Sequence, residues 1–237
     1  MNSPLLTPNS QAFLTYLEEW LLKLPVASLQ EMAGNPAAMA LLAVDVTVGF
    51  CSQGALASPR VGAIVDPIVR LMNLAHKHGV KHYILPQDTH EEDAVEFGAY
   101  PPHCIRGSEE SETVPEIKAL PFYNQMTVLP KNSIDSRYNT GLGEWLAQHP
   151  EVDTFIVTGD CTDLCVYQLA MFLRIEANAY QRKRRVIVPA DCVDTYDRPV
   201  GAAQKEGGFP HDGNLMHAIF LYHMALNGIE VVEQIQE

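Results

Sequence analysis

The sequence predicts a three-layer α/β/α fold with a mostly parallel sheet of roughly six strands. From residue 39 onward, short apolar runs typical of buried strands alternate with longer segments of helical periodicity. Strands that alternate with helices form βα units, and these units place helices on both faces of a parallel sheet. The 237 residues are 47% hydrophobic and 19% charged, which indicates a compact folded chain and argues against disorder.

The first 38 residues are expected to form a helical extension ahead of a domain that spans residues 39–237. Residues 10–24 place apolar side chains, Leu14, Leu17 and Leu21 among them, at helical spacing on one face. That face most simply packs onto the main domain, with a partner-binding helix as the alternative. Residues 27–38 are expected to be a connector.

The expected elements of the main domain follow from local patterns. Residues 39–46 form a continuous apolar run, as in a strand buried on both faces. The helix expected at 59–78 stops at Gly79, and the helix expected at 141–149 stops at Pro150. The remaining strands are expected at 80–85, 126–129, 154–158, 186–188 and 229–232, and the remaining helices at 162–180 and 214–227, with a long polar loop at 88–113.

Composition excludes several classes of function. The 16 basic and 29 acidic residues give a net charge of −13, and no face is dense in Lys or Arg, so a nucleic-acid partner is not expected. No apolar stretch reaches the roughly 18 residues of a membrane helix, and the N-terminus lacks the basic start of a signal peptide. Five cysteines, an odd number in a long chain, favour free thiols and a cytoplasmic location.

Ligands of parallel α/β sheets bind beyond the carboxyl ends of the strands, so the residues that follow each strand are the candidates for function. Asp45, Lys131 and Cys165 occupy such positions. Taken singly, each is more often a turn residue, a solvated cation or a small core residue. Together they place a carboxylate, an ammonium and a thiol on one edge of one sheet.

This combination predicts an acyl-transfer site with a Cys-Asp-Lys set. Cys165 is expected in the first turn of its helix, where the helix dipole and the nearby Lys131 would favour the thiolate. Asp45 can accept the thiol proton when the nucleophile forms. The backbone N–H groups of Cys161 and Cys165 are candidates for an oxyanion hole. Five other histidines are interpreted as structural or surface residues, namely His76, His78, His82, His217 and His223.

A second cluster predicts a metal site. Asp88 and His90 are spaced to project to the same side of a strand end, and His103 from the following loop would complete a set of three ligands. Carboxylate and imidazole ligands suit one divalent ion, with Zn first and Mn or Fe as alternatives. Glu96 lies between these residues, and Cys104 is an alternative soft ligand. The competing interpretation is a polar loop with ordinary histidines.

These motifs resemble the isochorismatase-like cysteine hydrolases, and within them the nicotinamidase/pyrazinamidase group, from about residue 40 to the end. The segment from Asp45 to Phe50 keeps the Asp and the Phe of the family's opening motif. The segment from Gly159 to Val166 matches the nucleophile motif Gly-x-x-Thr-Asp-x-Cys-Val. Asp88-Thr89-His90 and the Pro-x-His-Cys segment at 101–104 match the metal motif of nicotinamidases, which related amidohydrolases generally lack.

The resemblance implies roles for individual residues. Cys165 resembles the nucleophile, Asp45 the general base and Lys131 their electrostatic partner. Phe50 resembles the aromatic residue that stacks on a pyridine ring, and Tyr100 stands where many nicotinamidases have Trp. The metal ligands correspond to Asp88, His90 and His103, and Glu96 falls where some members have a further ligand. The bond between Asp160 and Cys161 resembles a cis peptide of the family.

The resemblance therefore implies a metal-assisted amidohydrolase that converts nicotinamide, or a close aromatic amide, to the acid and ammonia in NAD salvage and pyridine nucleotide biosynthesis. Thr47 in place of the usual Gln, together with Tyr100 and Cys161, keeps the substrate open. The alternatives are a related enzyme acting on another small amide or ureido compound and a non-catalytic interaction protein on the same fold. The implied partners are a small-molecule amide and further copies of the chain in a homo-oligomer.

Overall fold

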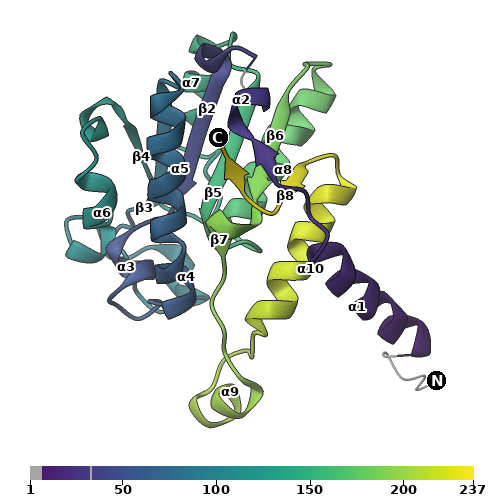
Figure 1. The fold of residues 1–237 in the computed structure, drawn as a ribbon. Coiled ribbons are helices and arrows are strands. Elements are labelled where there is room, and N and C mark those ends of the chain that lie inside the picture. The colour runs from purple at the N-terminus through teal and green to yellow at the C-terminus, as the bar shows by residue number, and fades with distance from the viewer. Residues whose placement is uncertain (1–6, 33) are drawn as a thin grey trace.

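The computed structural model describes residues 7–32 and 34–237 (Figure 1). Its main sheet has seven parallel strands, six of them in the spatial order β4-β3-β2-β5-β6-β8, with β7 paired to β5. The strands are β2 (Met39–Val44), β3 (His82–Asp88), β4 (Thr127–Lys131), β5 (Thr154–Asp160), β6 (Arg185–Pro189), β7 (Val193–Asp194) and β8 (Glu230–Val232). The predicted fold class is confirmed, and the sheet has seven strands rather than six.

Helices cover both faces of this sheet and form two apolar cores. One core joins the sheet to α7 (Leu142–Gln148), α8 (Cys165–Ala179) and α10 (Gly213–Leu226). The opposite core joins it to α5 (Val65–Lys77) and α6 (Pro115–Lys118). Along β2, alternate side chains enter the two cores: Ala40 and Leu42 face the first, and Leu41 and Ala43 face the second. Burial on both faces explains why β2 is a continuous apolar run.

The N-terminal segment is tied to the rest of the chain at two places. Helix α1 (Pro8–Leu21) buries Leu17 and lies beside α10 (Figure 1). Strand β1 (Ala27–Ser28) pairs with β9 (Ile235–Gln236) near the C-terminus, and α2 (Leu29–Met32) follows. The segment expected to be a connector therefore contains a strand and a helix. Residues 1–6 and 33 lie outside the described residues.

Several boundaries differ from the expected ones for physical reasons. The helix expected at 59–78 is two helices, α4 (Pro59–Ala63) and α5, because Pro67 has no N–H to donate to the carbonyl four residues earlier. Helix α8 starts at Cys165 rather than 162, since a turn precedes it in which the Leu164 N–H donates to the Cys161 carbonyl. Helices α3 (Val48–Cys51) and α9 (Val200–Glu206) are too short to show helical periodicity in the sequence.

None of the helices among the described residues is both long enough and apolar enough to span a membrane. All five cysteines are free thiols, as the sequence predicted.

Candidate active site

Four predicted residues meet at the carboxyl edge of the sheet because they end or follow neighbouring strands. Asp45 directly follows β2, Asp88 ends β3, Lys131 ends β4, and Cys165 begins α8 after β5. The parallel register sets Asp88 opposite Lys131. All four are buried, with exposed fractions of 5% or less. Burial of three ionisable groups and a thiol in one place is costly unless they interact, and this marks the cluster as a candidate site.

Lys131 is the centre of this cluster. Its Nζ lies 2.8 Å from Asp45 Oδ2, 2.6 Å from Asp88 Oδ1 and 3.7 Å from Cys165 Sγ. It also donates a hydrogen bond to the Ser133 carbonyl at 3.1 Å. The ammonium group therefore touches both carboxylates and the thiol at once. The structure brings together the three residues that the sequence predicted as a Cys-Asp-Lys set.

Two backbone features allow the strand ends to approach this closely. Asp45 has a positive φ of 54°, and its Oδ1 accepts a hydrogen bond from the Asp88 N–H at 2.7 Å. Gly159 has a φ of 109°, and a Cβ at this position would lie 1.9 Å from the Val44 carbonyl oxygen. Only glycine fits there, so the end of β5 can pass close beside β2 and deliver the turn that carries the thiol.

That turn, residues 161–164, is held by partners from distant segments. The Thr162 N–H donates to the Asp194 carbonyl, and Thr162 Oγ1 lies 2.9 Å from His217 Nδ1. Asp163 Oδ2 lies 2.8 Å from His211 Nε2. The peptide bond between Asp160 and Cys161 is cis. His211 was missed by the sequence analysis, and His217, predicted to be a structural or surface residue, contacts this turn.

The N–H groups of Cys161 and Cys165 are the predicted oxyanion-hole donors. In the part of the chain that the structure describes, neither N–H has a backbone acceptor among the turn and loop hydrogen bonds. Cys165 is the first residue of α8, where the N–H has no partner within the helix. Both donors therefore remain available for a ligand.

The surroundings of the thiol oppose the thiolate that was expected from the sequence. Burial is the largest effect on Cys165 and raises its pKa well above 9, and the charges of Asp45 and Asp88 add to it against the lowering effect of Lys131. Burial and the charge of Asp88 raise the pKa of Asp45 to about 6, although Lys131 opposes them. These effects favour a neutral thiol beside an ionised Asp45 near pH 7 and oppose the preformed thiolate expected from the sequence.

The second predicted cluster forms beside the first. One ligand-type atom each of Asp88, His90 and His103 lies within 4.8 Å of the others, and all three residues are buried. His90 Nε2 lies 3.4 Å from Asp88 Oδ1, and His103 Nε2 lies 3.6 Å from Asp88 Oδ2. Asp88 thus belongs to both clusters, because one of its oxygens also contacts Lys131.

The three residues fit a divalent metal ion. His90 Nδ1 pairs with Asn132 Oδ1 at 3.0 Å, and His103 Nδ1 pairs with the Pro101 carbonyl at 2.8 Å. Such pairing fixes the ring and leaves Nε2 as the ligand atom. Within the described residues, His90 Nε2 is buried with no hydrogen-bond partner. A buried unpartnered nitrogen facing a carboxylate suits a metal site.

Glu96 stands apart from this group of three. Its Oε2 accepts a hydrogen bond from the Ile134 N–H at 3.2 Å, while its Oε1 is buried without a hydrogen-bond partner in the described chain. Cys104, the alternative soft ligand, instead donates to the Glu110 carbonyl and contacts Thr47 Oγ1 at 3.7 Å. Thr47 is itself fully buried.

Aromatic rings surround the histidines. The ring centroid of Phe50 lies 5.4 Å from that of His103, and that of Tyr100 lies 6.4 Å from it. Phe97 lies 5.3 Å from His90 and 5.7 Å from His103. The sequence analysis missed Phe97 and Asn132. Asn132 directly follows Lys131 in the sequence, and this position at the end of a strand could have marked it as a candidate site residue.

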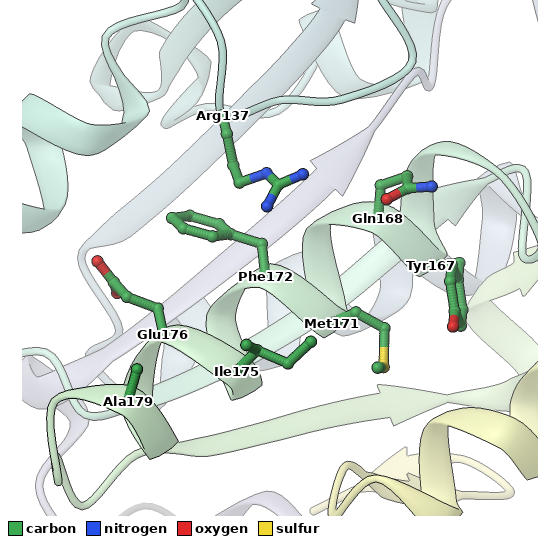
Figure 2. Close-up of a pocket in the computed structure, with 8 residues that line it drawn as sticks. All are labelled: Arg137, Tyr167, Gln168, Met171, Phe172, Ile175, Glu176 and Ala179. Carbon is green, nitrogen blue, oxygen red and sulfur yellow. The ribbon is translucent and has the colours of Figure 1, made fainter.

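A separate surface hollow lies along α8, between its side chains and Arg137 (Figure 2). Met171, Phe172 and Ile175 give it an apolar floor, and the guanidinium of Arg137 lies 5.3 Å from the ring centroid of Phe172. None of the predicted site residues lines it.

A parallel α/β sheet with a thiol, an ammonium and carboxylates at its carboxyl edge defines the class of protein, an α/β protein with a cysteine-centred site. The sequence profile of the isochorismatase domain matches residues 39–207. The chain belongs to the isochorismatase family.

Individual relatives show which members of the family this chain is similar to. Nicotinamidase 1 of Arabidopsis thaliana is 30% identical over 218 residues, which cover 82% of this chain and 85% of the relative. The crystal structure of N-carbamoylsarcosine amidase from Thermoplasma acidophilum has a TM-score of 0.59 and 25% identity, over 82% of this chain and 95% of that one. A pyrazinamidase of Pyrococcus horikoshii in complex with zinc has a TM-score of 0.63 and 20% identity, over 83% and 99%. The family and its nicotinamidase relative support a hydrolase.

Proposed function

We propose that this chain hydrolyses nicotinamide, or a close aromatic amide, to the carboxylic acid and ammonia through a thioester on Cys165. The observation that carries this proposal is the shared carboxylate of Asp88, which joins the Lys131-centred thiol site to a group suited to a metal. The resemblance associates this combination with nicotinamidases. The match to the Arabidopsis nicotinamidase and the zinc complex of the Pyrococcus pyrazinamidase support it.

The reaction starts from the neutral Cys165 thiol and the ionised Asp45. Asp45 takes the thiol proton while the sulfur attacks the amide carbonyl and forms the C–S bond. The N–H groups of Cys161 and Cys165 donate to the oxygen as it becomes negative. Asp45 then gives its proton to the departing nitrogen, the C–N bond breaks, and ammonia leaves. A thioester remains on Cys165.

Water completes the cycle. Asp45, ionised again, takes a proton from the water that attacks the thioester. The C–S bond breaks, the acid leaves, and the thiol recovers its proton. Lys131 keeps Asp45 in place and offsets the negative charge that the two carboxylates bring to the thiol.

Asp88, His90 and His103 are the residues that would hold the metal. A bound divalent ion would supply a Lewis acid that orients a ring nitrogen of the substrate and polarises water. Zn fits the carboxylate and imidazole set, and Mn or Fe are alternatives. Phe50 and Tyr100, both beside His103, are the proposed contacts for the aromatic ring of the substrate.

The test is the release of ammonia from nicotinamide, pyrazinamide and ureido acids by the purified protein. We expect kcat/KM to be highest for the two aromatic amides. The likeness to N-carbamoylsarcosine amidase favours a second candidate, a ureido compound, and a preference for ureido acids would replace our proposal with it. Release from none of these compounds would favour a non-catalytic protein on the same fold.

A further inference from the structure

A third cluster of chemically active side chains lies at the opposite end of the sheet from the proposed active site. His82 is the first residue of β3, whose last residue is Asp88. His149 caps the C-terminus of α7, and Glu151 lies in the turn that leads to β5. One ligand-type atom from each of the three lies within 4.8 Å of the others. The proposed reaction uses none of these residues.

The backbone holds the three side chains in position. The His149 N–H donates to the Trp145 carbonyl at 3.1 Å, and the Val152 N–H donates to the His149 carbonyl at 3.1 Å. The Asp153 N–H donates to the Ala38 carbonyl at 3.0 Å, which ties this turn to the start of β2. His82 is fixed as part of β3. A rigid frame of this kind reduces the entropy lost when a ligand binds.

The side chains are also fixed and yet open to solvent. The ring centroid of Trp145 lies 4.4 Å from that of His149 and 5.4 Å from that of His82. The centroids of the two imidazole rings are 4.8 Å apart. The His149 side chain is 30% exposed and that of Glu151 is 52% exposed. An ion from solution can therefore reach the cluster.

The spacing of the ligand atoms matches that of a small coordination sphere. His149 Nδ1 lies 3.1 Å from Glu151 Oε1. Tetrahedral Zn ligands at 2.0–2.1 Å from the ion are roughly 3.3 Å apart, so this pair is already at the required separation. Two imidazoles and a carboxylate also form a ligand set found at Zn sites that keep a position for water.

We propose that His82, His149 and Glu151 form a peripheral binding site for a divalent transition ion of the Zn, Ni or Cu type, separate from the Asp88 group. Mg and Ca do not fit this site, because they prefer oxygen ligands and two of the three ligand atoms here are imidazole nitrogens. An ion here links the start of β3, the end of α7 and the entry to β5. It therefore stabilises the folded chain.

Trp145 makes the site observable, because the chain has only two tryptophans and the other, Trp20, packs against Tyr222 in the contact between α1 and α10. A Trp20→Phe variant, stripped of metal with a chelator, leaves Trp145 as the only tryptophan. We expect Cu²⁺ to quench its fluorescence saturably near one equivalent. When His149→Gln is added to this variant, its apparent affinity for Cu²⁺ should fall at least about tenfold. That is the lower end of the loss seen when a group that supports a metal site is removed.

Calorimetry with Zn²⁺ gives a second, independent readout on the otherwise unaltered chain. We expect Glu151→Gln and His149→Gln each to weaken one class of Zn²⁺ binding, and His149→Gln to abolish the rise in Tm that Zn²⁺ gives through this site. His223→Gln is the matched control, an exposed histidine on α10 bonded to Tyr167. It should leave both readouts unchanged.

Variants of the Asp88 group separate this site from the active site. In a His103→Ala chain the quenching of Trp145 by Cu²⁺ should persist, whether or not that chain hydrolyses any amide. The proposal is overturned if His149→Gln and Glu151→Gln bind Cu²⁺ and Zn²⁺ as tightly as the parent chain. Quenching that disappears with His103→Ala and survives His149→Gln would overturn it as well.

Discussion

Asp88 Oδ1 lies 2.6 Å from Lys131 Nζ, and this contact joins the proposed nucleophile to the proposed metal group. The other oxygen of Asp88 lies 3.6 Å from His103 Nε2. Oδ1 also lies 3.4 Å from His90 Nε2, so both oxygens of Asp88 face the proposed metal group and one of them also contacts Lys131. A substitution at Lys131 should therefore affect both the thiol site and the proposed metal group.

Lys131→Met tests this coupling. Loss of the ammonium leaves Asp45 and Asp88 buried side by side without a cation, so the pKa of Asp45 should rise above about 6. We expect the acid limb of the pH–kcat/KM profile to move to higher pH and turnover to fall steeply. Breaking a buried ion pair by removing one partner costs about 3–5 kcal/mol, which urea unfolding would measure. Lys205→Met, at an exposed lysine of α9, should alter neither quantity.

Cys165→Ala should lower kcat by at least about 10³-fold, because no thioester can form. The fold should remain, since the change removes a single buried sulfur. Cys51→Ala, Cys104→Ala and Cys192→Ala are matched controls at three of the other four thiols and should keep substantial activity. Mass spectrometry of acid-quenched reactions should find an acyl adduct on the parent chain and none on Cys165→Ala. Normal turnover by Cys165→Ala would refute the mechanism.

The pH dependence follows from the raised pKa of Asp45. Asp45 acts as a base only when ionised, so kcat/KM should fall as pH drops through about 6, the value to which burial and Asp88 raise its pKa. The apparent value belongs to the coupled cluster rather than to Asp45 alone. A profile that stays flat down to pH 4 would contradict this assignment.

Thiol alkylation tests the state of Cys165 separately. Burial raises the pKa of Cys165 well above 9, so the rate of its alkylation should increase with pH throughout the range 6–9. The expectation drawn from the sequence alone was the opposite, a thiolate that persists well below the pKa of about 8.5 of a free thiol. Peptide mapping would assign the labelled cysteine, and a rate independent of pH from 6 to 8 would restore the earlier expectation.

The protonation of Cys165 shows where sequence reasoning reaches its limit. The positions of Asp45, Lys131 and Cys165 were predictable, because residues that end neighbouring parallel strands must meet at one edge of the sheet. The pKa of Cys165 was not, because it depends on how deeply the thiol is buried and on the proximity of Asp88, which the sequence assigned to the other cluster.

Other features depend on contacts between residues distant in the sequence. His211 reaches Asp163 across 48 positions, and no periodicity signals such a pair. Strand β7 has two residues, too few to alternate, and exists because its backbone pairs with β5. The role of Asn132 could not be predicted from the sequence, because it depends on the contact of its side chain with His90. Long, periodic elements were predictable from the sequence. Short elements and contacts between residues far apart in the sequence required the structure.

Metal removal should separate activity from folding. We expect about one divalent ion at the Asp88 group, lost to a chelator with a fall in activity, and activity restored by Zn, Mn or Fe. His90→Ala should lose this ion and activity together. Asn132→Ala removes the partner of His90 Nδ1, together with the acceptor of the Glu91 N–H, and should weaken metal affinity about 10–100-fold. Full activity of protein shown by elemental analysis to be metal-free would contradict this.

Glu96 is the one predicted ligand that stands apart from Asp88, His90 and His103, and two substitutions distinguish its possible roles. Its Oε2 accepts a hydrogen bond from the Ile134 N–H, whereas its buried Oε1 has no hydrogen-bond partner among the described residues. Glu96→Gln keeps an oxygen for the Ile134 N–H and removes the charge. Glu96→Ala removes both.

If Oε1 is a metal ligand, both variants should weaken metal affinity, because a neutral amide is a poorer ligand than a carboxylate for a divalent ion. If Glu96 only anchors Ile134, Glu96→Gln should bind the ion like the parent chain. Glu96→Ala should then lose about 1–3 kcal/mol of stability, the cost of a buried N–H without an acceptor. Metal titration by calorimetry and urea unfolding of the two variants give the four values needed. We expect Glu96→Gln to weaken binding, because a buried carboxylate oxygen without a donor is costly unless a cation lies near it.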